Sequence, residues 1–140
     1  MSISVKDDGL VKEVADSWAY GSNSGVHGLA LADHDGQLVL YAADLGGNSI
    51  WASNIDKAGK AGAGRRYQFS ETEMHPRHMT THPNGTYLYA IMEAGTSFKA
   101  LRVGEMEVDI AAAGNEYMLV PEGSCALRLA LSPCCLRPGH

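Results

Sequence analysis

The sequence predicts an all-β protein of the β-propeller class, and three observations lead to that prediction. Short segments rich in Val, Leu, Tyr and Ala alternate with turns that contain Gly and Asp. No segment before residue 105 has helical periodicity. The order of strands and turns then recurs, and three pairs of residues mark the repeat at separations of 48 or 49 positions: Gly36 and Gly85, Tyr41 and Tyr89, and Asp44 and Glu93.

A repeat of this length distinguishes between two all-β architectures. A period near 48 residues with several strands in each unit is typical of a propeller blade. A β-sandwich also has short, regular strands, but it need not repeat its turn chemistry. Complete propellers have about four blades or more, whereas this chain has about two blades with partial strands. We therefore expect residues 1–105 to form a partial propeller that leaves apolar faces uncovered.

Before the repeat begins, the chain has the pattern of a β-hairpin. Residues 2–5 alternate polar and apolar side chains, Asp7-Asp8-Gly9 supplies a turn, and a second strand follows over residues 10–14. This pair looks like the end of a sheet unit whose beginning is absent. The first full unit has three predicted strands, over residues 26–31, 38–43 and 49–55.

The second unit is centred on a hairpin that runs from His75 to Gly95. Pro83-Asn84-Gly85 forms its turn, because proline pre-sets one dihedral angle and Asn-Gly tolerates positive φ. Residues 87–92 are aromatic and aliphatic enough to form a largely buried strand. Between the two units, the basic pair Arg65-Arg66 is expected to lie in a solvated loop.

The last part of the chain has a different composition. Strands and turns no longer alternate, so residues 106–140 are predicted to be a divergent tail that is foreign to the fold. The alternative interpretation is a tail that binds a partner. Cys125, Cys134 and Cys135 are odd in number and lack metal-ligand spacing, so we expect neither metal nor redox chemistry there.

Composition argues against several classes of partner. Hydrophobic residues make up 45% of the chain, which predicts a folded domain. The net charge of −5 and the lack of clustered Lys and Arg argue against nucleic-acid binding. The N-terminus lacks a signal-peptide core, and no apolar run is long enough to span a membrane. We therefore expect a soluble cytoplasmic protein, and a homo-oligomer stays open.

Motifs for metal and cofactor chemistry are absent from the sequence. It contains no Walker loop, no Gly-x-Ser-x-Gly elbow, no His-Glu-x-x-His and no dinucleotide-binding glycine pattern. His75, His78 and His82 suggest a metal site, but no carboxylate or cysteine accompanies them at ligand spacing. We therefore predict neither a metal nor a cofactor.

The candidate functional residues are His27, Arg77 and Glu93. His27 and Arg77 lie at the starts of the inner strands of successive units, and Glu93 follows a strand of the second unit. Inner strands line the central channel of a propeller, so these side chains should converge there. Together they are suited to bind and protonate an anionic substrate. The structural alternatives are an interior hydrogen-bonded His27 and an Arg77–Glu93 ion pair.

Four stretches together carry a resemblance to a known family: residues 24–29, residues 41–45 with Asn48 and Trp51, residues 75–77, and residues 82–95. They resemble the fungal 3-carboxy-cis,cis-muconate lactonizing enzymes, and the likeness covers about residues 2–105. These enzymes are seven-bladed propellers related in fold to bacterial 6-phosphogluconolactonases. The resemblance therefore implies the same fold.

The resemblance also implies a reaction and its residues. The family carries out a cofactor-free cycloisomerisation in the protocatechuate branch of the β-ketoadipate pathway, and its substrate is a small tricarboxylate anion. Its active-site histidine, arginine and glutamate fall on His27, Arg77 and Glu93. Arg77 would hold a carboxylate, and either His27 or Glu93 would donate a proton. His78 stands where family members commonly have an aromatic residue, and a further arginine from a later blade has no counterpart here.

Two other functions stay open at this point. The first is a lactone hydrolase of the same fold, acting on a sugar-phosphate lactone, which would need a basic phosphate-binding cluster. The second is a non-catalytic propeller piece in which the ionisable residues are structural. A chain of about two blades is also open to being an inactive, truncated form of the cycloisomerase.

Overall fold

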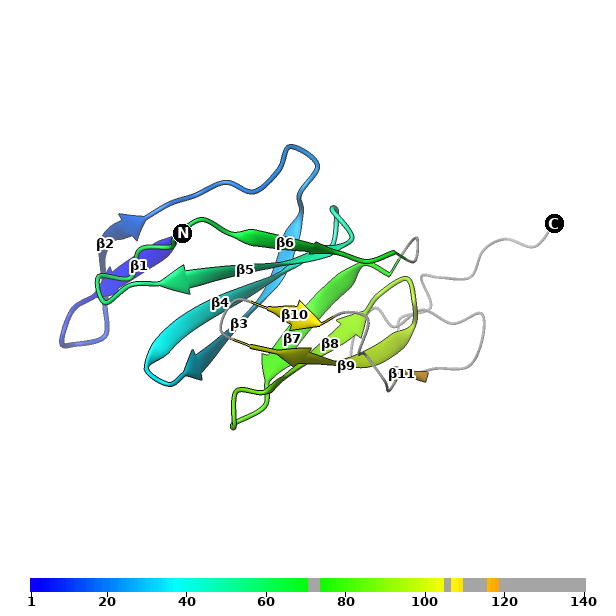
Figure 1. Ribbon diagram of the computed structural model, residues 1–140. Helices are drawn as coiled ribbons and strands as arrows, with labels where there is room; N and C mark the ends of the chain where they lie inside the picture. Colours follow the sequence, from blue (N-terminus) through cyan, green and yellow to red (C-terminus); the bar gives the residue numbers. More distant parts are fainter. Residues whose placement is uncertain (71–73, 105–106, 110–115, 119–140) are drawn as a thin grey trace.

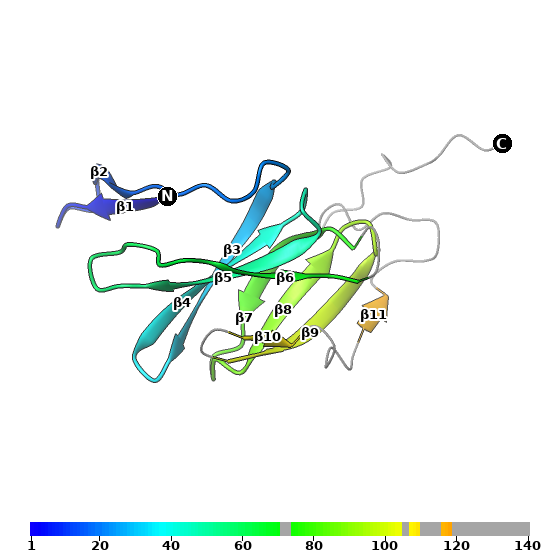
Figure 2. The same ribbon diagram turned by 45° about the horizontal axis from the view of Figure 1, so that its top comes forward.

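Every element in the described part of the chain is a β-strand, as predicted. The computed structural model describes residues 1–70, 74–104, 107–109 and 116–118. The strands form a two-stranded hairpin, a four-stranded sheet and a five-stranded sheet, all antiparallel (Figure 1). The two larger sheets are the predicted blades, and they pack side by side (Figure 2). Over the same residues, no helix exists that would be long and apolar enough to cross a membrane.

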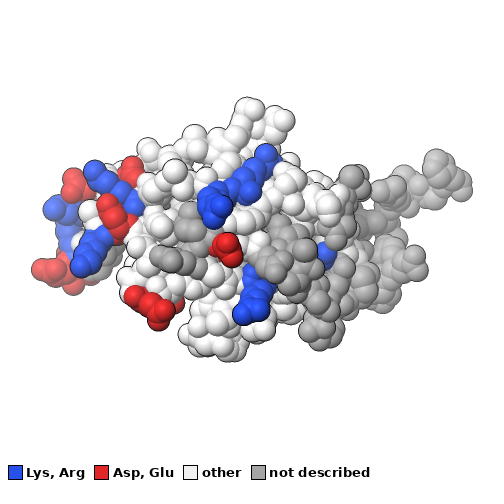
Figure 3. Space-filling view, in the orientation of Figure 1, with Lys and Arg blue, Asp and Glu red and all other residues white. Residues whose placement is uncertain are grey.

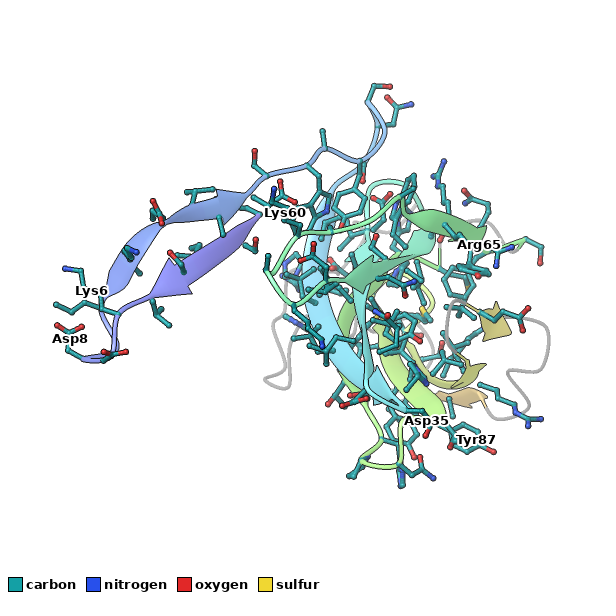
Figure 4. All side chains as sticks on the ribbon, turned by 60° about the vertical axis from the view of Figure 1, so that its left-hand side comes forward. Lys6, Asp8, Asp35, Lys60, Arg65 and Tyr87 are labelled. Atoms are coloured by element: carbon teal, nitrogen blue, oxygen red, sulfur yellow. The ribbon has the colours of Figure 1, made fainter. Side chains whose placement is uncertain are left out.

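The N-terminal hairpin pairs β1 (Ser2–Val5) with β2 (Val11–Asp16) and projects away from the blades (Figures 2 and 4). Lys6 and Asp8 lie at its far end (Figure 4). Charged side chains of both signs gather over this end of the molecule (Figure 3). The Oδ2 atom of Asp16 accepts a hydrogen bond from the backbone N–H of Ala61 at 3.2 Å, which ties the hairpin to the first blade.

The first blade consists of β3 (Val26–His34), β4 (Gln37–Asp44), β5 (Ser49–Ile55) and β6 (Arg65–Gln68), paired in that order. The turn between β3 and β4 contains Asp35 and Gly36, whose φ angles of 53° and 88° are both positive. Two positive φ values in a two-residue hairpin turn match the right-handed twist of the strands on either side.

The strand β6 corrects the sequence prediction, because Arg65 and Arg66 were expected in a solvated loop. The guanidinium of Arg66 donates to the carbonyl of Gly47 at 2.7 Å and to Ser49 Oγ at 2.9 Å. It also lies 5.7 Å from the ring centroid of Trp51. These contacts join β6 to β5 and to the turn before β5. The basic pair is therefore part of the fourth strand of the blade.

The second blade consists of β7 (Pro76–Thr81), β8 (Tyr87–Met92), β9 (Ser97–Val103), β10 (Val108–Asp109) and β11 (Glu116–Met118). Gly85, with φ 73°, lies in the turn between its first two strands, as Gly36 does in the first blade. Asp35 and Tyr87, which flank these two turns, lie at the same end of the molecule (Figure 4). The prediction of equivalent turns is confirmed.

Two strands lie beyond residue 105, where the partial propeller was predicted to end. Both β10 and β11 pair with β9, so the second blade extends into the predicted tail. The remainder of that tail, including its three cysteines, lies outside the described residues. The division into residues 1–105 and 106–140 therefore stays a prediction.

The strand pairing confirms the period of the repeat but corrects one of its matches. Asp44 pairs with Ser49 across the β4–β5 ladder, and in the second blade Met92 pairs with Ser97. Asp44 is therefore equivalent to Met92, and the predicted match with Glu93 is wrong by one residue. Glu93 lies in the turn directly after β8.

The core lies between the two blades. Its buried residues come from one face of each sheet and from the chain between β6 and β7, which supplies Phe69 and Met74: Ala30, Ala32, Val39, Tyr41, Ile50, Ala52, Phe69, Met74, Leu88, Ala90, Met92, Leu101, Val103 and Val108. Complete burial of a large apolar side chain such as Ile50 or Leu88 contributes about 1.5–3 kcal/mol. This shared core fixes the relative position of the two blades.

A hydrogen-bonded chain joins the blades at the end that carries the Gly36 and Gly85 turns. The hydroxyl of Tyr41 donates to the carbonyl of Gly104 at 2.9 Å and accepts from Nε2 of His34 at 3.0 Å. Burial, reinforced by nearby Tyr67, raises the pKa of Tyr41 well above its ordinary value, so its hydroxyl keeps the proton it donates. We call His34, Tyr41 and Gly104 the Tyr41 latch.

Candidate active site

The candidate site forms where the first strands of the two blades, β3 and β7, lie against each other. Thr81 Oγ1 donates to the carbonyl of Leu31 at 2.6 Å. Nearer the strand starts, Gly28 lies so close to Arg77 that a Cβ atom on Gly28 would overlap the Arg77 carbonyl oxygen. Close backbone approach of this kind is available to glycine because it lacks a side chain.

Both inner strands are irregular at the same place. The register of β3 shifts at His27, and the register of β7 shifts at Arg77. Such bulges insert an extra residue and redirect its side chain, and they are frequent beside active sites. The two bulged residues are equivalent positions of the repeat, which explains why neighbouring blades bring them together.

The structure brings together all three residues selected from the sequence. Arg77 Nε lies 3.1 Å from His27 Nε2 and 3.3 Å from Glu93 Oε2. The side chains of Arg77 and Glu93 are 16% and 23% exposed, so the ion pair is partly shielded from water while open to a ligand. The predicted convergence is confirmed, and the catalytic roles stay predictions.

The geometry also assigns a proton. An arginine Nε–H can donate but cannot accept, so His27 Nε2 accepts its hydrogen bond and carries no proton. His27 is therefore neutral in this arrangement, with its ring proton on Nδ1. Arg77 Nε–H is shared between an imidazole nitrogen and the carboxylate of Glu93.

A fourth member of the cluster, His78, was not selected from the sequence. Its ring centroid lies 4.9 Å from that of His27, with the two rings nearly perpendicular at 89°. Burial lowers the pKa of His78, and nearby His27 and Arg77 lower it further against the opposing effect of Glu93. The sequence offered no signal for it beyond its place directly after Arg77.

The approach to His27 is fixed by the turn that follows β4. Gly25, two residues before His27, donates its N–H to Asp44 Oδ1 at 2.8 Å. The carbonyl of Gly25 accepts from the N–H of Leu45 at 3.0 Å. Asp44 is fully buried. It therefore acts on the cluster through the backbone that leads to His27.

The three histidines that suggested a metal site have separate partners. His75 Nδ1 lies 2.7 Å from the carbonyl of Leu45, and His82 Nδ1 lies 2.6 Å from Asn84 Oδ1. His78 packs against His27 instead. Among the described residues, no three His, Cys, Asp or Glu side chains are gathered in a way that would hold a metal ion.

The fold and the cluster define a protein built from adjacent propeller blades, with ionisable groups where the inner strands meet. A family model for lactonases with a seven-bladed β-propeller matches residues 5–124. The chain belongs to this family of lactonases. The resemblance predicted from the sequence is thereby confirmed.

Individual relatives show how much of a propeller is present. The chain is 30% identical to the carboxy-cis,cis-muconate cyclase of Neurospora crassa over 125 residues, which cover 86% of this chain and 32% of the cyclase. A putative 6-phosphogluconolactonase from Bacteroides fragilis is similar in structure, with a TM-score of 0.62, 21% identity, and coverage of 76% and 34%. A protein from Lactobacillus plantarum gives a TM-score of 0.61, 19% identity, and coverage of 86% and 36%. The chain thus spans about a third of each relative, and the solved structures establish the fold alone.

Proposed function

We propose that the cluster of His27, Arg77 and Glu93 belongs to the active site of a cofactor-independent cycloisomerase. Its substrate would be 3-carboxy-cis,cis-muconate and its product 3-carboxymuconolactone. The observation that carries the proposal is the position of Arg77 Nε, 3.1 Å from His27 and 3.3 Å from Glu93, in a chain related to a muconate cyclase. Because the chain spans about a third of that cyclase, the proposal concerns a complete propeller that contains these two blades.

Arg77 is suited to be the main substrate-binding group. The substrate is a tricarboxylate, and a guanidinium matches the planar geometry of a carboxylate better than an ammonium does. Partial burial of the Arg77 side chain strengthens such a contact, because water screens it less.

The proposed reaction adds a carboxylate oxygen to one carbon of a conjugated double bond. The displaced electron pair forms an enolate-like anion with the adjacent carboxylate, and a proton is then delivered to the neighbouring carbon. Arg77 would stabilise that anion as a preorganised donor. The product has the same atoms as the substrate, so the reaction needs no oxidant or co-substrate.

Two side chains beside Arg77, His27 and Glu93, are candidates to supply the proton. His27 Nε2 accepts from Arg77 Nε–H, and Glu93 Oε2 faces the same cation, so both atoms are acceptors in this arrangement. A substrate carboxylate that pairs with Arg77 would compete with both groups for its guanidinium. Both His27 and Glu93 stay candidates for the donor.

Hydrolysis of a sugar-phosphate lactone is the alternative, because solved relatives are named as putative 6-phosphogluconolactonases. Their identities of 19% and 21% support a shared fold only. A phosphate group is commonly held by several donors or cations, whereas the cluster described above contains one guanidinium. The cluster therefore favours the cycloisomerase.

Two assays distinguish these functions, applied both to the chain as it stands and to the same blades completed with the remaining blades of the Neurospora cyclase. The first follows the loss of ultraviolet absorbance of 3-carboxymuconate, and the second follows hydrolysis of 6-phosphogluconolactone. We expect activity in the first assay from the completed propeller. Activity in the second assay alone would replace the proposal by its alternative.

Substitution of Arg77 tests the site itself. Arg77→Lys keeps the charge but loses the planar fork, so turnover should fall by roughly ten- to a hundredfold, since a hydrogen bond to a charged group is worth about 1.5–3 kcal/mol. The control is Arg102→Lys, at an exposed position of β9, which should leave turnover unchanged. If Arg77→Lys and His27→Ala both retain near-normal turnover of 3-carboxymuconate, the site lies elsewhere.

A further inference from the structure

His75, two residues before Arg77, has an unusual backbone conformation. Its φ angle is 50°, in the left-handed region that few residues other than glycine adopt. Such a conformation persists only where surrounding contacts hold it. The contacts of His75 therefore need an explanation beyond the metal site that the sequence suggested.

Three hydrogen bonds hold His75 and connect the two blades. Its backbone N–H donates to Asn48 Oδ1 at 2.8 Å, and its ring Nδ1 lies 2.7 Å from the carbonyl of Leu45. A carbonyl can only accept, so Nδ1 carries the proton. On the other side, the carbonyl of His75 accepts from the N–H of Glu93 at 3.0 Å. His75 thus joins a turn of the first blade to a site residue of the second.

The same turn also fixes the other side of the cluster. Leu45 donates its N–H to the carbonyl of Gly25, which lies two residues before His27. The turn at residues 45–48 therefore fixes the chain before His27 directly. It fixes the chain before Arg77 through His75.

We propose that His75 is a positioning residue that sets the distance between Arg77 and His27 by anchoring the start of β7 and Glu93 to the turn at residues 45–48. The geometric part of this inference does not depend on the reaction. Its consequence for turnover rests on the proposed function. His75 touches neither His27 nor a reacting atom in the proposed scheme, so it acts through the backbone.

The test measures ring nitrogen resonances of the histidines in the full chain by long-range proton–nitrogen NMR. His75→Asn is the conservative variant, because an asparagine amide N–H can take the place of ring Nδ1–H and asparagine tolerates positive φ. His75→Ala removes the donor. We expect wild type and His75→Asn to show His27 protonated on Nδ1, and His75→Ala to shift the Nε2 resonance and give a mixture of tautomers.

The Tyr41 latch supplies an internal control. His34 donates through Nε2 to Tyr41, whose own proton goes to Gly104, so the His34 resonances report the blade contact at the opposite end. They should be the same in wild type and both variants. A His75→Ala protein with unchanged His27 resonances would overturn the inference.

A second variant covers the case in which His75→Ala disturbs the whole fold. Asn48→Gly removes the Oδ1 acceptor, keeps a residue that tolerates the positive φ of 49°, and leaves His75 in place. If the His27 resonances change in Asn48→Gly while the His34 resonances do not, the positioning role is supported. Altered His34 resonances in both His75→Ala and Asn48→Gly would show that His75 supports the fold in general, which would also overturn it.

Kinetics separate this inference from the proposed function. In the completed propeller, His75→Ala should lower turnover of 3-carboxymuconate by on the order of tenfold to a hundredfold, as small misplacements of catalytic groups do, and His75→Asn should restore most of it. The expected NMR changes without muconate turnover in wild type would leave the positioning role intact and refute the proposed function. Normal turnover in His75→Ala would refute the positioning role and leave the proposed function intact.

Discussion

The two blades share strand order and turn glycines, but they differ at one equivalent position, Asp44 in the first blade and Met92 in the second. Both side chains are fully buried. Asp44 accepts four hydrogen bonds, from the N–H groups of Gly25 and Gly47, from Ser49 Oγ and from Trp51 Nε1. Met92 is part of the apolar core. A buried position tolerates a carboxylate only when its oxygens are satisfied, and here they are.

This difference shows that an acidic residue near the same point of the repeat has a structural role in one blade and a candidate catalytic role in the other. In the first blade the acidic residue ends β4 and accepts a hydrogen bond from Gly25, two residues before His27. In the second blade the acidic residue comes one position later, in the turn after β8, where Glu93 reaches Arg77. A displacement of one residue thus separates a buried structural carboxylate from a candidate catalytic one.

Removing the carboxylate of Asp44 should have the largest effect on stability. Asp44→Ala leaves several buried donors unpaired, each at a cost of about 1–3 kcal/mol, so we expect a loss of about 3 kcal/mol or more. Met92→Leu at the equivalent position conserves volume and should cost less than about 1.5 kcal/mol. Urea denaturation of both variants measures the difference. Equal losses would mean that Asp44 is not the organising group of its blade.

The pH dependence of stability follows from the same carboxylate. Burial alone would raise the pKa of Asp44, but hydrogen bonds from Trp51, Gly25 and Gly47 outweigh burial and hold its pKa below the ordinary value. A lowered pKa in the folded state stabilises the fold above the unfolded-state pKa of about 3.9, and that contribution is lost as pH falls further.

The matching variant for this test is Asp44→Asn, which does not titrate. The difference in Tm between wild type and Asp44→Asn should be constant above about pH 5 and should narrow below about pH 4. Thermal denaturation monitored by circular dichroism over this range measures it. If the difference in Tm widened as the pH falls, the pKa of Asp44 would be raised, which would contradict the hydrogen-bond argument.

The sequence predicted those parts of the fold that depend on local pattern. Alternating apolar residues and turn glycines located three strands of the first blade, β3 to β5, and the hairpin of β7 and β8 in the second. The convergence of His27 and Arg77 also followed, because equivalent strand starts of neighbouring blades meet. The strand at Arg65 was missed because its pairing depends on Trp51 and Gly47, which lie far from it along the chain.

The details of the site depend on strand register and backbone conformation, which a comparison of residue types along the sequence does not reveal. Aligning Asp44 with Glu93 paired two acidic residues, whereas strand pairing aligns Asp44 with Met92. Nothing in the sequence marks the left-handed backbone of His75 or the packing of His78 against His27. These features arise from contacts between blades.

The inner strands β3 and β7 approach each other closely at Gly28, and the equivalent residue of the second blade is not a glycine. A substitution of Gly28 can therefore separate the two strands. Gly28 and His78 occupy equivalent positions, directly after the two bulges. Gly28→Ala would push its methyl group against the Arg77 carbonyl, so β3 and β7 must separate at a cost of about 1–3 kcal/mol. Denaturation measures this cost, and the His27 ring resonances should lose the signature of the Arg77 hydrogen bond.

The control for Gly28 is Gly21→Ala, in the polar loop before β3. A Cβ atom at Gly21 meets no other heavy atom within 4 Å. This substitution should cost nothing, and the reduced freedom of the unfolded chain can stabilise the fold by about 0.4–1 kcal/mol. Similar losses in the two variants would show that the strand contact at Gly28 is not close enough to exclude a methyl group.

The smallest expected difference concerns two tyrosines at equivalent positions, Tyr41 and Tyr89. Tyr41→Phe removes the hydroxyl that links His34 to Gly104, a loss of about 0.5–1.5 kcal/mol for a buried hydrogen bond. Tyr89→Phe keeps the ring that stacks on Phe98 at 5.5 Å, so the change should stay within about 0.5 kcal/mol.

Denaturation curves and the His34 ring resonances together check this last pair of variants. His34 should change tautomer or resonance position in Tyr41→Phe, because its hydrogen-bond acceptor is gone, and should be unaffected in Tyr89→Phe. If both tyrosine variants lose the same stability, the hydroxyl of Tyr41 does not hold the blades together. The contact between blades at this end would then depend on core packing alone, through Leu88, Leu101 and their neighbours.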